Sequence, residues 1–263
     1  MPEGHTIHRL AAQHKDMFAG AAVRATSPQG RFAQGAALLD GRVLEGTDAH
    51  GKHLFHRYAG DVWLHVHLGL YGAFSHGGAP PPEPRGALRL RLVGETTYAD
   101  LRGPTACEVI ETPRRTALLA RLGPDPLRAG ADPAVAWRRV SRSPAPLGAL
   151  LLNQQVLSGI GNVYRSEVLF RAGIAPHRPG RELAAAEWDA LWTDLRRLLR
   201  AGVRSGRIVT TRPEDRRRGR AAAADRCYVY RRVGEPCRRC GTPVRAQLMA
   251  ARTVSWCPNC QPR

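Results

Sequence analysis

The chain has 263 residues, with 40 lysines and arginines against 22 acidic residues, so its formal net charge at pH 7 is +18. Residues 200–263 alone hold 16 arginines and four acidic residues, which favours a densely negative partner such as nucleic acid. Hydrophobic residues make up 43% of the chain, but no apolar run is long enough to cross a membrane and no apolar signal region opens it, which predicts a cytoplasmic protein.

The first half of the chain has the pattern of a helix followed by short strands. Apolar residues at helical spacing between Ile7 and Phe18 predict an amphipathic helix that begins near Thr6. Short segments bounded by Gly, Pro or Asp then predict strands at Val43–Thr47, His53–Tyr58, Val62–Leu68, Leu88–Val93, Thr96–Leu101 and Cys107–Glu111. The alternation in Leu88–Leu92 is typical of a half-buried antiparallel strand. Residues 1–125 are therefore expected to form a helix and an antiparallel sandwich or barrel.

The pattern changes after Leu122-Gly-Pro-Asp-Pro126. Residues 126–204 predict a helical domain, with helices over Leu147–Leu157, Val163–Ala172 and Leu183–Leu199. Residues 205–226 are polar, rich in arginine and without periodicity, which favours a flexible basic loop. Residues 227–263 form a last, small module.

Four cysteines in that module have the spacing of a metal site. Cys237 and Cys240 form one C-x-x-C pair, and Cys257 and Cys260 form a second after sixteen intervening residues. Two such pairs predict a tetrahedral structural zinc site that joins two turns too small to hold a core alone. A disulfide or a redox pair is the alternative.

Two further segments could carry chemistry. Gly159-Ile-Gly161-Asn162 places two glycines directly before a helix, where free N–H groups can bind phosphate and Asn162 could act as N-cap; a plain helix connection is the alternative. Pro2 would carry a secondary amine once Met1 is removed. Such an amine can attack an aldehyde carbon to give a charged iminium, with Glu3 beside it as a proton donor or acceptor.

Several motifs occur together in one order and carry a resemblance. They are Met1-Pro-Glu-Gly, Gly51-Lys52-His-Leu, Leu68-Gly-Leu-Tyr-Gly72, Leu122-Gly-Pro-Asp-Pro126, Gly159-Ile-Gly-Asn-Val-Tyr164 and the cysteine pairs with Arg252. Over essentially its whole length the chain resembles the formamidopyrimidine-DNA glycosylase/endonuclease VIII family, and its opening is similar to the actinobacterial endonuclease VIII members. The resemblance implies an α+β fold, with an N-terminal helix and β-sandwich, a helix–two-turn–helix domain and a zinc finger.

The resemblance also implies a bifunctional DNA glycosylase and abasic-site lyase of base-excision repair. Pro2 would form a Schiff base with C1′ of the damaged nucleotide, Glu3 would protonate the sugar ring oxygen, and Lys52 would contact phosphate and assist. β-Elimination and then δ-elimination would cut both sides of the sugar.

The partner implied is double-stranded DNA with a damaged base or an abasic site, bound by a monomer in the nucleoid. Gly161 and Asn162 would bind a phosphate beside the lesion, and Arg252 another from the zinc-finger hairpin. Leu70 and Tyr71 would fill the gap left by the flipped nucleotide, unless both simply cap the sandwich core.

The expected class of damaged base follows from a residue that one stretch of the chain lacks. The family branch that removes 8-oxoguanine carries Arg and Phe in its insertion loop, whereas Asp100-Leu-Arg102-Gly-Pro-Thr105 has no Phe. This favours oxidised pyrimidines. The alternatives are oxidised purines such as 8-oxoguanine and formamidopyrimidine, or a non-catalytic zinc and helix–turn–helix DNA-binding protein.

The chain departs from the family pattern at three positions. Thr6 replaces a usual Glu, Gly69 a larger polar residue, and Asn153 a usual Asp. His5 and His8 could partly replace the carboxylate missing at Thr6, or they could lie on the helix surface. His65 and His67 share one face of a strand and are interpreted as sheet-face histidines, because no third metal ligand is evident.

Overall fold

The computed structural model describes residues 2–216 and 222–262. They fall into two compact units, residues 1–121 and residues 122–263. Helices and antiparallel strands occur in both, so the predicted α+β class is confirmed. Among the described residues, no helix combines the length and the apolar character needed to cross a bilayer.

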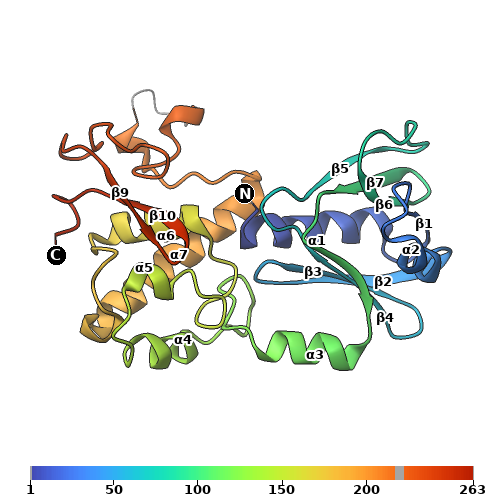
Figure 1. The fold of residues 1–263 in the computed structure, drawn as a ribbon, viewed down its shortest axis with the longest axis horizontal. Coiled ribbons are helices and arrows are strands. Elements are labelled where there is room, and N and C mark those ends of the chain that lie inside the picture. Colours follow the sequence, from blue (N-terminus) through green and yellow to red (C-terminus); the bar gives the residue numbers. More distant parts are fainter. Residues whose placement is uncertain (1, 217–221, 263) are drawn as a thin grey trace. The chain divides into compact units, whose positions relative to one another are not determined.

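The N-terminal unit is an antiparallel sheet wrapped around one helix, α1 (Gly4–Phe18) (Figure 1). The strands run in the order β5-β7-β6-β1-β2-β3-β4-β8. Their bounds are β1 (Ala22–Thr26), β2 (Arg42–His50), β3 (His53–Tyr58), β4 (Val62–His67), β5 (Ala73–Gly78), β6 (Leu88–Val93), β7 (Thr97–Arg102) and β8 (Ala106–Ile110). Pairing between β1 and β2 is short, so the sheet bends there into two halves, and α1 lies between them (Figure 1).

The predicted helix and all six predicted strands form, each with bounds shifted by at most a few residues. Four elements were not predicted: β1, β5, α2 (Ala33–Leu39) and α3 (Thr112–Ala120). Helix α3 buries none of its residues, and β5 is mostly exposed, so neither carries a periodic apolar face. Strand β6 is also more buried than its alternation suggests, because Arg91 forms a bidentate ion pair with Asp100 (2.8 and 2.9 Å) inside the unit.

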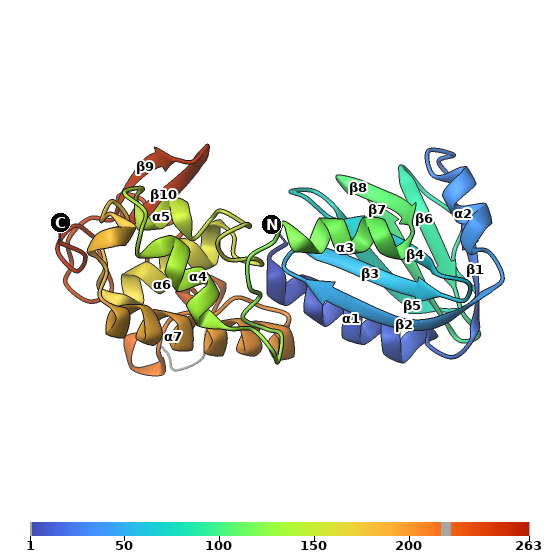
Figure 2. The same cartoon turned by 90° about the horizontal axis from the view of Figure 1, so that it is seen from below.

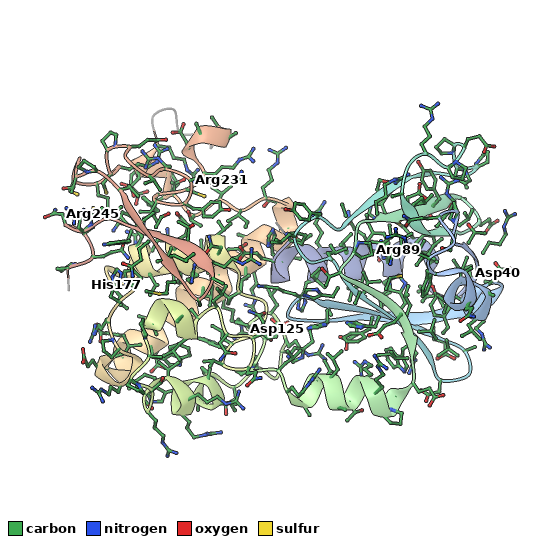
Figure 3. The ribbon with its side chains drawn as sticks, in the orientation of Figure 1. Asp40, Arg89, Asp125, His177, Arg231 and Arg245 are labelled. Atoms are coloured by element: carbon green, nitrogen blue, oxygen red, sulfur yellow. The ribbon has the colours of Figure 1, made fainter. Side chains whose placement is uncertain are left out.

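The C-terminal unit packs four helices beside a small hairpin. The helices are α4 (Pro133–Val140), α5 (Leu147–Leu150), α6 (Asn162–Ala172) and α7 (Ala185–Ser205), and the hairpin pairs β9 (Arg245–Met249) with β10 (Arg252–Trp256). The expected helix over Leu147–Leu157 was wrong beyond Leu150, because the side chain of Asn153 accepts from the Gln155 N–H (2.9 Å) and turns the chain. His177, labelled in Figure 3, lies in the segment after α6 and hydrogen-bonds the side chain of Gln247 in β9 (2.9 Å).

One buried carboxylate holds the chain that leads from α7 to the hairpin. Glu167 of α6 accepts from three consecutive backbone N–H groups, those of Tyr228 (2.7 Å), Val229 (2.9 Å) and Tyr230 (2.8 Å). It also accepts from the Thr210 hydroxyl. The expected flexible loop over 205–226 therefore has both ends pinned, with short 3₁₀ turns at Pro213–Asp215 and Ala223–Asp225, whereas its centre, 217–221, lies outside the described residues.

Histidines are buried in unusual number in the N-terminal unit. His14 of α1 shares one hydrogen bond with His56 of β3 (2.9 Å) and another with His76 of β5 (2.8 Å), so it connects both halves of the sheet. His14 and His56 are fully buried. Burial lowers the pKa of His56 to about 3, and burial followed by the neighbouring histidines lowers the pKa of His14 well below its ordinary value.

We expect the N-terminal unit to lose stability when the pH falls from 7 to 5. His5, His53 and His56, with pKa values of about 4, 3 and 3, stay neutral in the folded protein, whereas in the unfolded chain they bind protons below about pH 6.5. Stability is therefore complete above that pH and declines below it, by about 2 kcal/mol at pH 5 for each such histidine. Urea unfolding at both pH values measures the difference. His56→Gln should reduce it by about one histidine's share, and an unfolding midpoint independent of pH would contradict the prediction.

Candidate functional site

Four segments of the N-terminal unit converge at one end of its sheet. The Thr47 hydroxyl of β2 donates to the carbonyl of Ala11 (2.6 Å), and Ala19 pairs with Leu44. Helix α1 therefore runs opposite to β2, and its first residues lie toward the β2–β3 turn. Because His67 pairs with both His53 and Ala106, the β4–β5 loop begins and the β7–β8 connection finishes at the same end of the sheet.

Pro2 and Glu3 stand at the start of α1 within this end. Pro2 is partly exposed, whereas Glu3 is fully buried at the N-cap position. The carbonyl of Glu3 accepts from Thr6 N (2.9 Å), and its carboxylate makes no capping hydrogen bond with the helix. The partial positive charge of a helix N-terminus favours a carboxylate there. A buried acid therefore lies one residue from an accessible amine position.

His5 is buried, so the surface alternative for this residue was wrong. Burial and, second, the positive charge of the chain terminus lower its pKa to about 4, which keeps the ring neutral at pH 7. The His5 ring lies 3.3 Å from the Thr6 hydroxyl, so at the position of the missing carboxylate a hydroxyl contacts an imidazole.

Lys52 occupies the turn between β2 and β3. Residues His50 and His53 pair across this turn, and Gly51 has φ +59°, a left-handed conformation that suits the first central position of a two-residue hairpin. Lys52 is partly exposed. It lies close enough to His67 for its charge to lower the pKa of that ring, after burial and His65. The turn thus presents the lysine at the same sheet end as Pro2 and Glu3.

A chain of hydrogen bonds runs along the outer face of the sheet to the residue after Lys52. Glu108 accepts from Nδ1 of His65 (2.9 Å), and Nε2 of His65 lies 2.9 Å from Nδ1 of His53. Since a carboxylate only accepts and burial lowers the pKa of His65, the neutral ring must donate through Nδ1 and accept through Nε2. His53 is therefore the donor to His65. Both nitrogens of His65 are engaged, in agreement with its interpretation as a sheet-face residue.

Leu70 and Tyr71 project from the β4–β5 loop. They are 40% and 88% exposed, so the alternative that both cap the sandwich core was wrong. Gly69 has φ +68°, and a Cβ there would lie 1.8 Å from the hydroxyl of Thr105. A larger residue at position 69 would therefore need both a strained backbone and a displaced Thr105.

The Asp100–Thr105 stretch does not form a loop long enough to insert into a partner. Residues 100–102 end β7, and Ala106 already begins β8, so three residues connect the two strands. Asp100 is buried in its ion pair with Arg91, and Arg102 contacts the same carboxylate (3.3 Å).

In the C-terminal unit, Gly161 and Asn162 open helix α6. Gly161 is the N-cap, so the expectation that Asn162 caps the helix was wrong; Asn162 is its first residue. Gly159 has φ +88°, which requires glycine, and its N–H donates to the side chain of Gln154 (3.0 Å). The amide of Asn162 donates to the carbonyl of Thr253 in β10 (2.7 Å), which leaves its second N–H for another acceptor.

Arg165 is a residue of this site that the sequence analysis did not single out. Its fully buried guanidinium donates to the side chain of Asn162 and to the carbonyls of Gly148 (3.3 Å), Met249 (3.2 Å) and Arg252 (3.4 Å). Met249 and Arg252 flank the hairpin tip, where Ala250 and Ala251 both have positive φ. One arginine thereby fixes the hairpin to the start of α6. The position of Arg165, a charged residue in a predicted helix that is rich in apolar residues, was the signal in the sequence that could have indicated its structural role.

The Leu122–Pro126 motif and Asn153 both stabilise the turn that precedes α6. Gly123 N donates to the carbonyl of Gln154 (2.8 Å), and a Cβ on Gly123 would lie 2.4 Å from the carbonyl of Val156. The Leu122–Pro126 motif therefore packs backbone to backbone against the turn before α6. Asn153 forms the side-chain turn that an aspartate would form, so its substitution changes charge rather than geometry.

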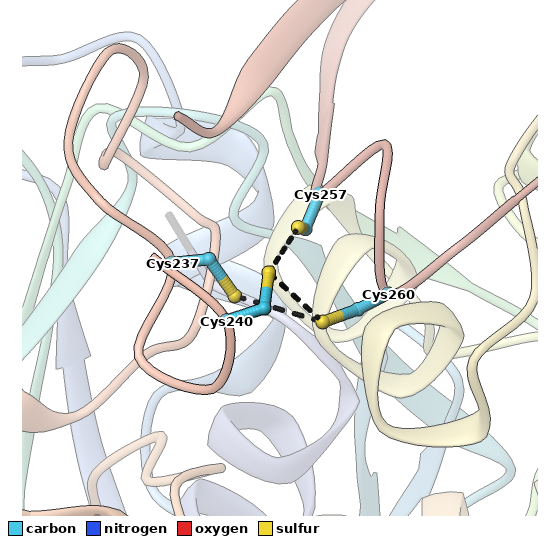
Figure 4. Close-up of side chains that lie close together, drawn as sticks. All are labelled: Cys237, Cys240, Cys257 and Cys260. Carbon is cyan, nitrogen blue, oxygen red and sulfur yellow. Dashed lines mark hydrogen bonds between the residues drawn. The ribbon is translucent and has the colours of Figure 1, made fainter. Parts of the chain in front are cut away.

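The four predicted cysteine ligands come together. Their sulfur atoms lie within 4.8 Å of one another, with separations of 3.9 Å for Cys237–Cys260, 3.5 Å for Cys240–Cys257 and 3.4 Å for Cys240–Cys260 (Figure 4). A tetrahedral zinc ion with Zn–S bonds of about 2.3 Å requires sulfur separations of about 3.8 Å, whereas a disulfide requires about 2.05 Å. The donor set and its spacing fit zinc and exclude paired disulfides in this geometry.

Comparison with known families accounts for most of the chain. Residues 1–107 match the formamidopyrimidine-DNA glycosylase N-terminal domain, residues 122–213 match the formamidopyrimidine-DNA glycosylase H2TH domain, and residues 234–263 match the zinc finger found in FPG and IleRS.

Individual proteins show the same relation. Endonuclease 8 1 of Mycobacterium tuberculosis is 52% identical, with 99% of this chain and all of that protein aligned. The formamidopyrimidine-DNA glycosylase of Thermus thermophilus is 37% identical, over 86% of this chain and 85% of the relative. The solved structure of MutM in complex with carbocyclic 8-oxo-G containing DNA shares the fold, with a TM-score of 0.82 at 22% identity over the full length of both chains.

Proposed function

The chain belongs to the formamidopyrimidine-DNA glycosylase/endonuclease 8 family and is a DNA glycosylase of base-excision repair, and from this premise we propose that it removes oxidised pyrimidines and cleaves the resulting abasic sites through its N-terminal proline. The observation that carries the proposal is the convergence of Pro2, Glu3 and Lys52 at one end of the sheet. Endonuclease 8 1, at 52% identity, favours this lesion class more than the 37% identical formamidopyrimidine-DNA glycosylase does.

The reaction starts at the amine of Pro2. Its nitrogen attacks C1′ of the damaged nucleotide, the bond from C1′ to the base breaks, and the base leaves with a proton. Glu3, buried beside it, protonates the sugar ring oxygen, so the ring opens and the nitrogen lone pair forms a C1′ iminium. A secondary amine gives an iminium that cannot lose its charge by deprotonation, which makes it a strong electron sink.

The iminium then drives strand cleavage. Loss of the proton on C2′ sends its electron pair toward C1′ and breaks the C3′–O bond, which expels the 3′-phosphate. A second proton loss, at C4′, breaks the C5′–O bond and expels the 5′-phosphate. Lys52, on its two-residue turn, supplies the positive charge that stabilises the phosphate and assists these proton transfers.

The remaining contacts hold the DNA. Gly161 and the second N–H of the Asn162 amide bind a phosphate at the start of α6, and Arg252 binds another from the hairpin. The exposed Leu70 and Tyr71 fill the space of the flipped nucleotide. We propose zinc as the ion held by Cys237, Cys240, Cys257 and Cys260, and a monomer acting at the nucleoid.

The lesion class is tested with matched duplexes that differ in one base. We expect faster excision of thymine glycol and hydroxylated uracils than of 8-oxoguanine, because the three-residue β7–β8 connection has no Phe and cannot form a long insertion loop. An abasic duplex reports the lyase step separately. Preferential excision of 8-oxoguanine would overturn the pyrimidine assignment and leave the glycosylase assignment intact.

Replacing Arg252 by alanine is expected to weaken binding equally for every lesion. Arg252 is exposed directly after the hairpin tip, and its proposed partner is a backbone phosphate rather than a base. The slope of log K against log salt should fall by about 0.9, the value of one phosphate contact. Binding titrations at several salt concentrations measure it, and a loss confined to one lesion would contradict this role.

A further inference from the structure

Helix α7 carries a cluster of arginines on the face that does not pack into the unit. Its inner face buries the apolar residues Trp188, Leu191, Trp192, Leu195, Leu198 and Leu199. On the outer side, a hollow is lined by Thr193, Arg196, Arg197, Arg200 and Arg204, with Trp192 at its floor. Four guanidinium groups thus surround one depression.

The described part of the folded protein does not neutralise the charges of Arg196 and Arg200. No acidic residue follows Asp194 in α7, and the Asp194 carboxylate already accepts from Arg171 (2.5 and 2.8 Å) and from Arg197 (2.7 Å). Within the residues that the structure describes, the side chains of Arg196 and Arg200 have neither a hydrogen bond nor an ion pair, and Nε of Arg196 is buried without a partner.

Clustering of this kind costs stability rather than adding to it. Like charges four residues apart on a helix repel by about 0.2–0.5 kcal/mol per pair. The helix dipole accounts for Arg204 in the last turn, but its effect fades within that turn and does not reach Arg196 or Arg200. The cluster therefore calls for an anionic ligand outside the chain.

The lining of the hollow indicates which kind of anion. A protein partner would need exposed apolar or aromatic anchors beside the arginines, since the centre of a protein interface is apolar and aromatic residues carry much of its binding energy. Here only Thr193 and the four arginines are accessible, because Trp192 is 5% exposed. Arginine forks match phosphate geometry, and Arg196 and Arg200 lie roughly 6 Å apart along the helix axis. The chemistry is that of a phosphate backbone.

This face is separate from the start of α6 and the hairpin. Helix α6 contacts both β10 and α7 and so lies between them. Figure 2 shows the hairpin and α7 on opposite sides of the C-terminal unit. A straight duplex held by Asn162 and Arg252 therefore does not reach the α7 cluster. We propose that the outer face of α7 is a second, sequence-independent DNA-binding surface that holds a duplex segment other than the one at the start of α6.

The test compares two double variants of the full-length zinc-containing protein. In Arg196→Gln/Arg200→Gln the proposed surface loses two charges. In Arg24→Gln/Arg31→Gln the N-terminal unit loses two exposed arginines that have no partner among the described residues. The number of short undamaged duplexes bound per protein at low salt is measured by mass photometry, together with the salt dependence of binding to long undamaged DNA.

We expect wild type and the Arg24/Arg31 control to bind two duplexes and the α7 variant to bind one. The salt slope of the α7 variant on long DNA should fall by about 1.8, which corresponds to two phosphates. The excision rate of the α7 variant on a short duplex with one lesion should match that of the wild type. Because excision is measured separately from the number of bound duplexes, a failure of the proposed glycosylase mechanism is distinguishable from a failure of the second binding surface. The proposal would be overturned if the α7 variant still bound two duplexes, or if the control variant lost as much DNA binding as the α7 variant. It would also be overturned if polyglutamate displaced bound DNA more strongly than competing duplex of equal charge did.

Discussion

Replacing Pro2 by glycine is expected to remove base excision while DNA binding persists. The variant keeps an N-terminal amine, but this amine is primary, so its iminium can lose the N–H proton and become a neutral imine, whereas the proline iminium has no such proton and stays charged. Glycine also lacks the fixed φ that proline provides at the start of α1. A misplacement of about 1 Å at a reacting atom can cost about 100-fold, so we expect at least that loss. Single-turnover excision of a duplex with one oxidised pyrimidine measures it.

Glu3→Gln is the companion change. It keeps the size of the buried side chain at the N-cap but cannot donate a proton to the sugar, so we expect a loss of about 10²–10⁴-fold in excision. Fluorescence anisotropy with an uncleavable abasic analogue should give nearly unchanged affinity for both variants. Wild-type excision by a preparation whose N-terminus is shown by mass spectrometry to be glycine would remove Pro2 from the mechanism.

A borohydride trap locates the nucleophile independently of these variants. Reduction of the iminium fixes the sugar to the attacking nitrogen, and peptide mapping then identifies the residue. We expect the adduct on Pro2. An adduct on Lys52 would assign the nucleophile to the β2–β3 turn instead, and the absence of any adduct with abasic and damaged duplexes would favour a protein that binds DNA without catalysis.

Removal of the metal is the second change with a large expected effect. The core of the zinc module is small, formed by Phe170, Tyr228, Val229, Val244 and the two buried cysteines Cys237 and Cys257. Structural zinc contributes about 10–16 kcal/mol of apparent binding free energy in isolated fingers, which such a core cannot replace. We expect chelation, or Cys240→Ser, to unfold residues 227–262 and to abolish tight DNA binding through Arg252.

The matched control is the thiol outside the cluster in the N-terminal unit. Burial raises the pKa of Cys107 to about 12, so this thiol is protonated and inert at neutral pH. Cys107→Ala should retain one zinc ion per chain, measured by elemental analysis, and wild-type DNA affinity. A Cys240→Ser protein with the full metal content and unchanged affinity would contradict the proposed ligand set.

The sequence was most informative where a local pattern is enough. The spacing of the cysteine pairs predicted a cluster that the structure brings within 4.8 Å, because each C-x-x-C turn aims two sulfurs at one point. Helix α1 and the strands from β2 to β4 were also predicted correctly, because their periodic apolar residues are a local pattern. Elements without a buried periodic face, such as α3 and β5, gave no such signal.

Only the tertiary structure decided how distant residues meet. The amino-acid order does not reveal that Arg165 joins Asn162 to both strands of the hairpin, or that Glu108 fixes the proton positions of His65 and His53. These contacts depend on long-range packing, in which buried polar groups must find partners wherever the fold places them. The sequence by itself thus determined which residues were present for chemistry, and the tertiary structure decided which of them lie together and which, like Arg196 and Arg200, face outward without a partner in the described chain.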